Sequence, residues 1–332
     1  MSKRKIGKGS MDVTIEQLRA STISTTGDLE AANPQIAIDP NTNPQLLRKI
    51  ATASNWELRR LVASNPNTPT DALWQLGIDF PEAVLNNPVF EILQIEQLQL
   101  AAEIPHATLT SLLQCDCVPR NLMEYAVDRQ DYSLWLAVAY NPQTPSTLLE
   151  NLARKSRRQD RELIRAVAAH PNAPQHLLAE IIDISESVAQ VVAENAKTSL
   201  DVLTKILKKY AQANDPTFPT LVALHPLLSA GLLMQMYLAP SEAAARSLWL
   251  AKQITTESTQ LVELAHTDWT VLRLAVVRHP NTPSTTIEQI WDRVQLARIA
   301  HTQMDRLIYD SFAVNSNTST RIRSELRKLL TW

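Results

Sequence analysis

The chain has 332 residues, more than one hydrophobic core usually holds, so it folds as two ordinary domains or as a stack of repeats. Hydrophobic residues make up 45% of it, enough to bury apolar side chains along the whole length, which excludes global disorder. The 32 basic and 34 acidic residues give a net charge of −2, so no overall charge draws the chain to nucleic acid or to an anionic membrane.

The glycine and cysteine content excludes further classes of protein. The chain has only 5 glycines and no glycine cluster, whereas dinucleotide and phosphate loops need clustered glycines. Its two cysteines, Cys115 and Cys117, cannot form a disulfide framework and indicate a reducing compartment. No apolar run is long enough to span a bilayer, and the start lacks the apolar core of a secretory signal. We therefore expect a cytoplasmic protein.

Residues 1–10 form a basic tail, for which we expect no fold, and residues 11–320 are predicted to form one array of repeats. A motif recurs in this array: a small apolar pair, a variable residue, then Asn, Asp or His followed by Pro-x-Thr-Pro. We call the residue before the first proline the anchor residue. The anchor spacing runs from 22 residues (Asn65 to Asn87) to 36 (His279 to Asn315), which predicts about ten repeats of roughly 26 residues. The anchor residues are Asp39, Asn65, Asn87, Cys115, Asn141, His170, Asn195, His225, Gln253, His279 and Asn315.

Each repeat is predicted to contain two helices. A residue before proline avoids the α conformation, so one helix ends at the anchor. The threonine can then cap the next helix, and the second proline fits its first turn. An amphipathic segment follows, such as residues 45–51, and after a polar break a second, shorter helix such as residues 56–63 reaches the next anchor. Neither helix can bury its apolar face alone, and strand signals are poor, so we predict an all-α solenoid of stacked repeats.

The Asn-Pro-Asn-Thr-Pro sequence at 65–69 and its relatives resemble the leucine-rich repeat variant (LRV) family over roughly residues 33 to 320. The resemblance implies a right-handed superhelix in which an α-helix alternates with a shorter 3₁₀ helix. Members of that family can also carry a separate cysteine cluster with an iron–sulfur centre. Such a centre normally needs four thiolates, which two cysteines cannot supply, so we expect no cofactor.

Arginines are the main candidates for partner binding. Six basic residues fall within residues 154–165, and they form either a docking patch for phosphate or an acidic protein surface, or a solvated loop between helices. Arg59, Arg60, Arg165 and Arg273 each precede an anchor by five or six residues, which predicts either an arginine ridge or ion pairs with neighbours such as Glu57. The predicted partner-binding residues are Arg59, Arg60, Arg154, Lys155, Arg157, Arg158, Arg161 and Arg165.

Aromatic, histidine and cysteine residues offer weaker candidates. Trp56, Trp135 and Trp269 lie at a similar place in their repeats, and we expect them to pack between repeats, with an exposed aromatic ridge as the alternative. The histidines at anchors 170, 225 and 279 are too far apart to share a metal, so capping or packing is expected. A zinc or redox role for the two cysteines would need partners that the sequence does not place nearby.

The chain ends in a basic amphipathic helix, residues 321–332, which we expect to cap the solenoid; binding to an acidic partner or a membrane surface is the alternative. No catalytic motif occurs, so we expect no enzyme, no metal site and no small-molecule substrate. The predicted function is an interaction scaffold that binds a protein partner through the solenoid surface. The alternative is a nucleic-acid-binding repeat protein that uses the arginine ridge.

Overall fold

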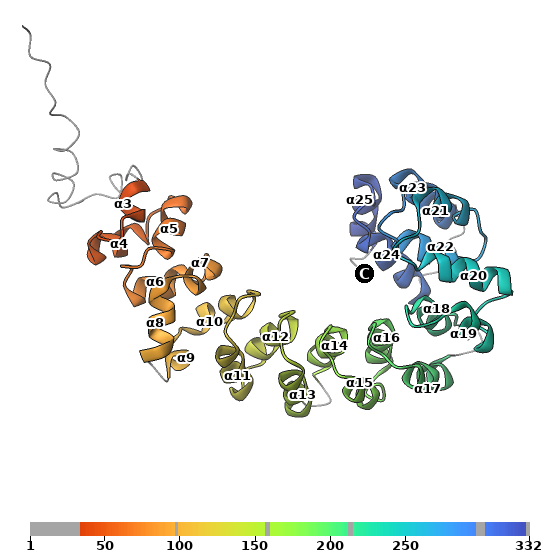
Figure 1. The fold of residues 1–332 in the computed structure, drawn as a ribbon, viewed down its shortest axis with the longest axis horizontal. Coiled ribbons are helices and arrows are strands. Elements are labelled where there is room, and N and C mark those ends of the chain that lie inside the picture. The colour runs from red at the N-terminus through yellow and green to blue at the C-terminus, as the bar shows by residue number, and fades with distance from the viewer. Residues whose placement is uncertain (1–33, 97–98, 157–159, 212–214, 297–302, 330–332) are drawn as a thin grey trace, which may run out of the picture. The chain divides into compact units, whose positions relative to one another are not determined.

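The computed structural model describes residues 34–96, 99–156, 160–211, 215–296 and 303–329. Over these ranges the secondary structure consists of α-helices with no β-strand, which confirms the all-α prediction. The helices fall into two compact units, residues 1–143 and 144–332, and each unit is described by itself (Figure 1). The predicted basic tail, residues 1–10, lies outside the described residues.

Two kinds of helix alternate in both units. An anchor helix ends at or just before an anchor residue, and a return helix follows the Pro-x-Thr-Pro segment. In the first unit the anchor helices are α3 (Pro34–Ile38), α5 (Trp56–Ala63), α7 (Pro81–Leu85), α10 (His106–Leu113) and α12 (Tyr132–Tyr140). Its return helices are α4 (Pro44–Ile50), α6 (Thr70–Leu76), α8 (Pro88–Glu96) with the short α9 (Leu100–Glu103), and α11 (Arg120–Asp128).

The second unit continues the alternation. Its anchor helices are α14 (Arg161–Ala169), α16 (Glu186–Glu194), α18 (Thr217–Leu224), α20 (Glu242–Ala251), α22 (Thr270–Arg278) and α24 (Gln303–Val314). Its return helices are α13 (Ser146–Lys155), α15 (Gln175–Ile181), α17 (Leu200–Tyr210), α19 (Ala230–Gln235), α21 (Ser258–Leu264), α23 (Ser284–Leu296) and α25 (Thr320–Leu329). The predicted C-terminal cap is therefore the return helix of the last repeat, with Ile322 and Leu326 buried.

The anchor helices are neither 3₁₀ helices nor consistently shorter than the return helices. Helix α5 has 8 residues, for example, and the return helices on either side of it have 7 each. No 3₁₀ segment occurs among the described residues. The expectation of a shorter second helix was therefore wrong. The physical reason is that a segment such as Leu-Arg-Arg-Leu-Val-Ala in α5 contains no proline or glycine and so completes ordinary α-helical turns.

Neighbouring anchor helices pack against each other, and this stacking forms the core. In the first unit α3 contacts α5, α5 contacts α7, α7 contacts α10 and α10 contacts α12. The apolar pair before each anchor lies in this contact, and Val62 and Ala63 are fully buried there. Return helices cover one side of the stack: in α4, Leu47 and Ile50 are fully buried and Leu46 is partly buried.

The anchor asparagines join each repeat to the one before it. Asn65 Nδ2 donates to the carbonyl of Ala37 at 2.7 Å and to that of Asp39, the preceding anchor, at 3.0 Å. Its Oδ1 accepts from the backbone N–H of Asn67. The same pair of carbonyl contacts is made by Asn87, Asn141, Asn195 and Asn315. These bonds confirm the predicted register, including the less obvious anchors at Cys115 and Asn195.

Histidine anchors make a similar but smaller set of bonds. In His225, Nδ1 accepts from the N–H of Leu227 and Nε2 donates to the carbonyl of Asn195 at 2.9 Å. His279 bonds in the same way to the carbonyl of Gln253, at 2.8 Å. Both imidazoles are buried and bonded to the backbone, as the expected capping or packing role requires.

The predicted role of the motif threonines was wrong. Thr68 does not cap the helix that follows; its hydroxyl donates to the carbonyl of Val62, six residues earlier, and so closes the preceding anchor helix. The residue at the N-cap of α6 is Pro69, which makes no side-chain cap. Thr68 lies one residue before the N-cap position, which Pro69 occupies, and its hydroxyl points back to the preceding helix. The same backward bond is made by Thr42, Thr198, Thr256, Thr282 and Thr318.

Candidate functional site

A cavity of the first unit lies across three successive anchor helices. It has a volume of about 580 Å³ and is lined by residues of α5, α7 and α10 and of the loop before α7. Its charged lining residues are Arg60, Asp79 and Glu82. Because α5, α7 and α10 belong to successive repeats and pack on one another, the stacking itself builds this hollow.

An exposed tryptophan stands beside this cavity. Trp56 begins α5 and keeps 59% of its surface exposed. Its ring lies 5.4 Å from that of Phe80, which lines the cavity, and the Arg60 guanidinium lies 6.0 Å from the Trp56 ring. An aromatic ring held in place by neighbours and still exposed is typical of residues that dominate protein–protein binding.

The other two tryptophans of the expected series do not extend this surface. Trp135 is partly buried, and its Nε1 donates to the carbonyl of Val127. Trp269 is partly buried at the N-cap of α22 in the second unit. Trp135 and Trp269 are thus partly buried, and only Trp56 of the three is exposed.

The charges around the first cavity are largely paired. Arg59 forms an ion pair with Asp79 of the next repeat and lies 5.4 Å from the Phe80 ring centroid. Arg60 pairs with Glu57 at 2.9 Å, and their hydrogen bond raises the pKa of the arginine and lowers that of the glutamate. Glu82 has no hydrogen-bond or ion-pair partner among the described residues, which leaves this cavity with one unneutralised carboxylate.

Cys115 lines the inner part of the cavity. Burial raises the pKa of its thiol to about 11, with smaller contributions from Cys117, Glu82 and Asp116. The thiol is therefore protonated at neutral pH, and a protonated thiol is a poor nucleophile and metal ligand. Cys117 is exposed, and both cysteines are free thiols. Within the described ranges no group of three or more His, Cys, Asp or Glu is placed to hold a metal ion.

The second unit has a smaller cavity, of about 270 Å³, on its own anchor helices. Its lining comes from α14, α16, α18 and α24. The charged residues are Arg165, Glu194, Arg306 and Asp310. Of these, only Arg165 was predicted from the sequence. The sequence did not indicate Arg306 and Asp310, because they are far from Arg165 along the chain. They share a cavity with α14 only in the folded protein.

The structure separates the predicted basic cluster at 154–165. Arg154 lies on α13 and pairs with Glu150 at 3.1 Å, whereas Arg161 and Arg165 lie on α14, where Arg161 is exposed. Lys155 is the last residue of α13. Arg157 and Arg158 lie outside the described residues.

The predicted ridge of arginines is also interrupted by pairing. Arg59 and Arg60 both pair with carboxylates, and Arg273 donates to the carbonyl of Asp268. The ion pair of Arg60 with Glu57 is the one proposed from the sequence, whereas Arg59 pairs across repeats with Asp79. Among the ridge residues, Arg60 lines the cavity of the first unit and Arg165 lines that of the second.

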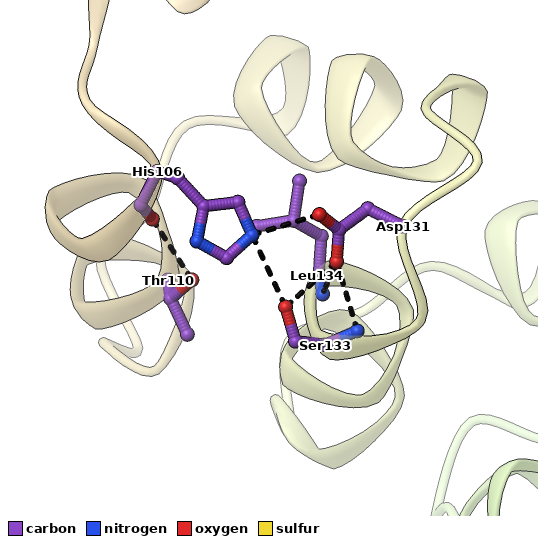
Figure 2. A network of polar contacts seen from close by, with 5 residues as sticks. All are labelled: His106, Thr110, Asp131, Ser133 and Leu134. Carbon is purple, nitrogen blue, oxygen red and sulfur yellow. Dashed lines mark hydrogen bonds and ion pairs between the residues drawn. The ribbon is translucent and has the colours of Figure 1, made fainter.

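A serine, a histidine and an aspartate meet on the first unit, as Figure 2 shows. Asp131 Oδ2 lies 2.8 Å and Ser133 Oγ 3.2 Å from the same nitrogen, Nε2 of His106. In a catalytic triad the carboxylate and the serine contact opposite ring nitrogens. Here Ser133 donates its proton to Asp131 Oδ1 at 2.7 Å, and this bond is the main cause of the lowered pKa of that carboxyl.

The same aspartate caps a helix. Asp131 Oδ1 accepts from the backbone N–H groups of Ser133 and Leu134, the second and third residues of α12. The contact of His106 with Asp131 ties α10 to the start of α12 in the following repeat (Figure 2). The geometry is that of an N-cap with an added contact between repeats rather than that of a nucleophilic serine.

Comparison of the chain with protein-family models, with curated proteins and with solved structures found no match. None of the described helices combines the length and the apolar character that crossing a membrane requires.

Proposed function

We propose that this protein is a non-catalytic interaction scaffold that binds a protein partner through its anchor helices. The observation that carries the proposal is the cavity of about 580 Å³ across α5, α7 and α10, with Trp56 exposed beside it. Stacked repeats commonly offer such surfaces because each repeat adds a similar strip of side chains. An aromatic residue next to arginine beside a hollow is the combination enriched at binding hot spots.

The charges of the cavity favour a particular kind of partner segment. Arg60 and Asp79 are each paired with a neighbour, so they need no further counter-ion. Glu82 is exposed and lies on the cavity wall. A segment that places a lysine or arginine against Glu82 and an apolar side chain against Trp56 would satisfy both features.

The test is a pull-down with the tagged full chain from nuclease-treated lysate, comparing the wild type with Trp56→Ala and Glu82→Lys. We expect a stoichiometric protein partner that survives nuclease and whose affinity falls about 30-fold with Trp56→Ala, the scale of a hot-spot loss. Trp249→Ala is the matched control, because Trp249 is also exposed, at 43%, and lines neither cavity. Thermal melting of each variant separates lost binding from lost folding.

Equal capture by the wild type and Trp56→Ala would contradict the proposal. Nucleic acid that co-purifies and disappears with nuclease would instead support the alternative, a nucleic-acid-binding protein. In that case binding should fall steeply between about 50 and about 200 mM salt, and glutamate at Arg157, Arg158 and Arg161 should abolish it. The pairing of Arg59, Arg60 and Arg154 with carboxylates favours the protein partner, because a paired arginine must break its ion pair to bind a phosphate.

The finer description of the architecture belongs to the same proposal. We propose a right-handed superhelix of about ten repeats that resembles the LRV family and works in the cytoplasm without a cofactor. Its support is the regular series of anchor bonds, which link successive repeats in the same way wherever an asparagine occupies the anchor.

A further inference from the structure

The cavity of the second unit is closed by contacts between helices far apart in the sequence. Arg278, the last residue of α22, donates to Ser311 Oγ of α24 at 2.8 Å. The same guanidinium reaches Glu194, at the end of α16, at 3.3 Å. Helix α18 contacts both α22 and α24. Residues of α14, α16, α18 and α24 together line the cavity.

Two arginines from helices far apart in the sequence line this cavity. Arg165 comes from α14 and Arg306 from α24, and both are exposed to solvent. Within the described part of the chain neither guanidinium has a hydrogen-bond or ion-pair partner. Arg59, Arg60 and Arg154, in contrast, are each paired with a carboxylate. Two guanidiniums without partners that line a small hollow leave ten N–H donors for one shared ligand.

One carboxylate without an ion-pair partner among the described residues, that of Asp310, lines the cavity with them and is exposed to solvent. The charges of Arg306, Arg278 and Arg165 all act on Asp310, yet partial desolvation by the cavity walls outweighs them and raises the pKa of its carboxyl. Glu194 is already paired with Arg278. The cavity therefore carries an excess of positive charge, and Asp310 is the group that competes with any anion for the arginines.

We propose that this cavity binds the phosphate group of a phosphomonoester, with Arg165 and Arg306 as its ligands. A phosphate offers three free oxygens, which two guanidiniums can clamp together, whereas a single guanidinium already satisfies a carboxylate. A volume of about 270 Å³ is about nine times the ~30 Å³ that one water occupies, which leaves room for a phosphate and a small attached group. Ser187 at the wall adds a hydroxyl donor.

The proposal is independent of the partner surface on the first unit. Binding of inorganic phosphate, O-phosphoserine and a phosphoserine peptide to the full chain is measured by titration calorimetry at constant ionic strength, with succinate as the carboxylate probe. We expect saturable binding of the phosphate probes and not of succinate. Tighter binding of the peptide would assign the site to a phosphorylated protein, and tighter binding of O-phosphoserine to a small metabolite.

Three variants make the test specific. The double substitution Arg165→Gln/Arg306→Gln should weaken phosphate binding about tenfold or more, because it removes two charge-assisted contacts. Asp310→Asn should tighten binding several-fold, since it removes the competing anion, and a merely structural role would not have this effect. Arg246→Gln on α20 of the same unit is the matched control, exposed and outside the cavity, and should leave binding unchanged. Absence of saturable phosphate binding by the folded wild type, equal binding of succinate, or an Asp310→Asn effect of the opposite sign would overturn the proposal.

Discussion

At the residue scale, the anchor position selects for side chains that can reach two carbonyls of the preceding repeat. Asparagine supplies two N–H donors and one acceptor, and all three are used at Asn65. The neutral imidazole of His225 has one donor and one acceptor and so reaches one carbonyl. Each bond contributes about 1 kcal/mol net, but a buried carbonyl left without a donor costs about 1–3 kcal/mol. The anchor side chain therefore matters chiefly because the buried carbonyls that it contacts would otherwise have no donor.

In the repeat with Gln253 at the anchor, a different side chain bonds to the two carbonyls of the preceding repeat. The neighbouring Lys252 Nζ donates to the carbonyls of Ala223 and His225, the positions that an anchor asparagine would contact, and also to that of Leu228. Burial lowers the pKa of Lys252 to about 8. A long side chain one residue earlier thus reaches the same acceptors, which sequence alignment on the anchor alone does not reveal.

His225 makes the free energy of unfolding depend on pH in the acidic range. Burial, aided by the charge of Lys252, lowers the pKa of His225 below its ordinary value of 6.5. The unfolded chain then binds the proton more readily than the folded one, so this contribution to stability is complete above about pH 6.5 and is lost as the pH falls below it. We expect His225→Asn to stay within about 1 kcal/mol of the wild type at pH 7, because an asparagine suits this position.

Urea unfolding at pH 7 and pH 5 checks this prediction. The wild type should lose more stability on acidification than His225→Asn does. His266→Asn, at an exposed histidine, is the control and should keep the acid dependence of the wild type. An equal loss in the wild type and His225→Asn would mean that His225 is not the titrating group.

Much of the motif's role was predictable from the residues, but the direction of its bonds was not. The anchor ends its helix, as the following proline requires. The threonine, however, donates to a carbonyl of the helix it follows rather than accepting from an N–H of the next helix. Both choices satisfy a backbone group, and the sequence does not distinguish them. The threonine is buried between stacked repeats, and this burial selects the bond to the preceding helix. Stacking is a tertiary property, which the local sequence does not show.

At the scale of elements, one glycine sets how closely two helices approach. Gly77 ends the return helix α6, and a Cβ added to it would lie 2.7 Å from Thr108 Cγ2 of α10. Thr108 cannot move away freely, because it is fully buried and its hydroxyl donates to the carbonyl of Trp74 at 2.6 Å. The glycine is needed here for close approach, since its φ of −64° is available to any residue.

Gly77→Ala should therefore destabilise the protein by about 1–3 kcal/mol, the usual cost of overpacking, despite the lower entropy of the unfolded alanine chain. Thr108→Ser removes the offending methyl group and keeps the hydroxyl bond, so the double variant should recover much of the loss. Chemical denaturation of the two single variants and the double variant measures the coupling. Strictly additive losses would show that the contact does not limit the approach of the helices.

The existence of the elements was easier to predict than their lengths. Leucine spacing and proline punctuation indicate both helices of each repeat, and the structure contains both. The final repeat shows the limit of such reasoning. Its anchor, Asn315, still bonds to Val277 and His279 although 36 residues separate the two anchors. The longer spacing does not disturb the bonds of this anchor, and no local sequence pattern predicts that.

At the scale of the whole molecule, the candidate sites were the least predictable feature. Whether an arginine is free depends on carboxylates in other repeats, as with Arg59 and Asp79. The phosphate cavity joins Arg165 of α14 to Arg306 of α24, and Arg278 closes it by pairing with Glu194 across 84 positions. A single repeat contains none of these relations, so the sequence could suggest arginine-rich segments but not which arginines share a cavity.

The stacking of repeats also predicts how far a local defect spreads. In an array where each repeat contacts mainly its neighbours, stability is a sum of repeat and interface terms, and damage stays local. Asn87→Ala removes the side chain that bonds to the carbonyls of Ala63 and Asn65, at a cost of about 2–3 kcal/mol. Asn86→Ala is the matched control, because Asn86 is the adjacent residue and is exposed.

Amide hydrogen exchange followed by mass spectrometry would locate the defect. In Asn87→Ala we expect faster exchange in α5, α7 and α10, whose packing depends on this interface, and unchanged exchange over residues 144–329. Asn86→Ala should match the wild type throughout. Faster exchange in all helices at once would instead mean that the chain opens as one cooperative block, so that the nearest-neighbour description fails. If the loss of protection fades with distance from residue 87, the anchor bonds are the local links between repeats that their geometry indicates.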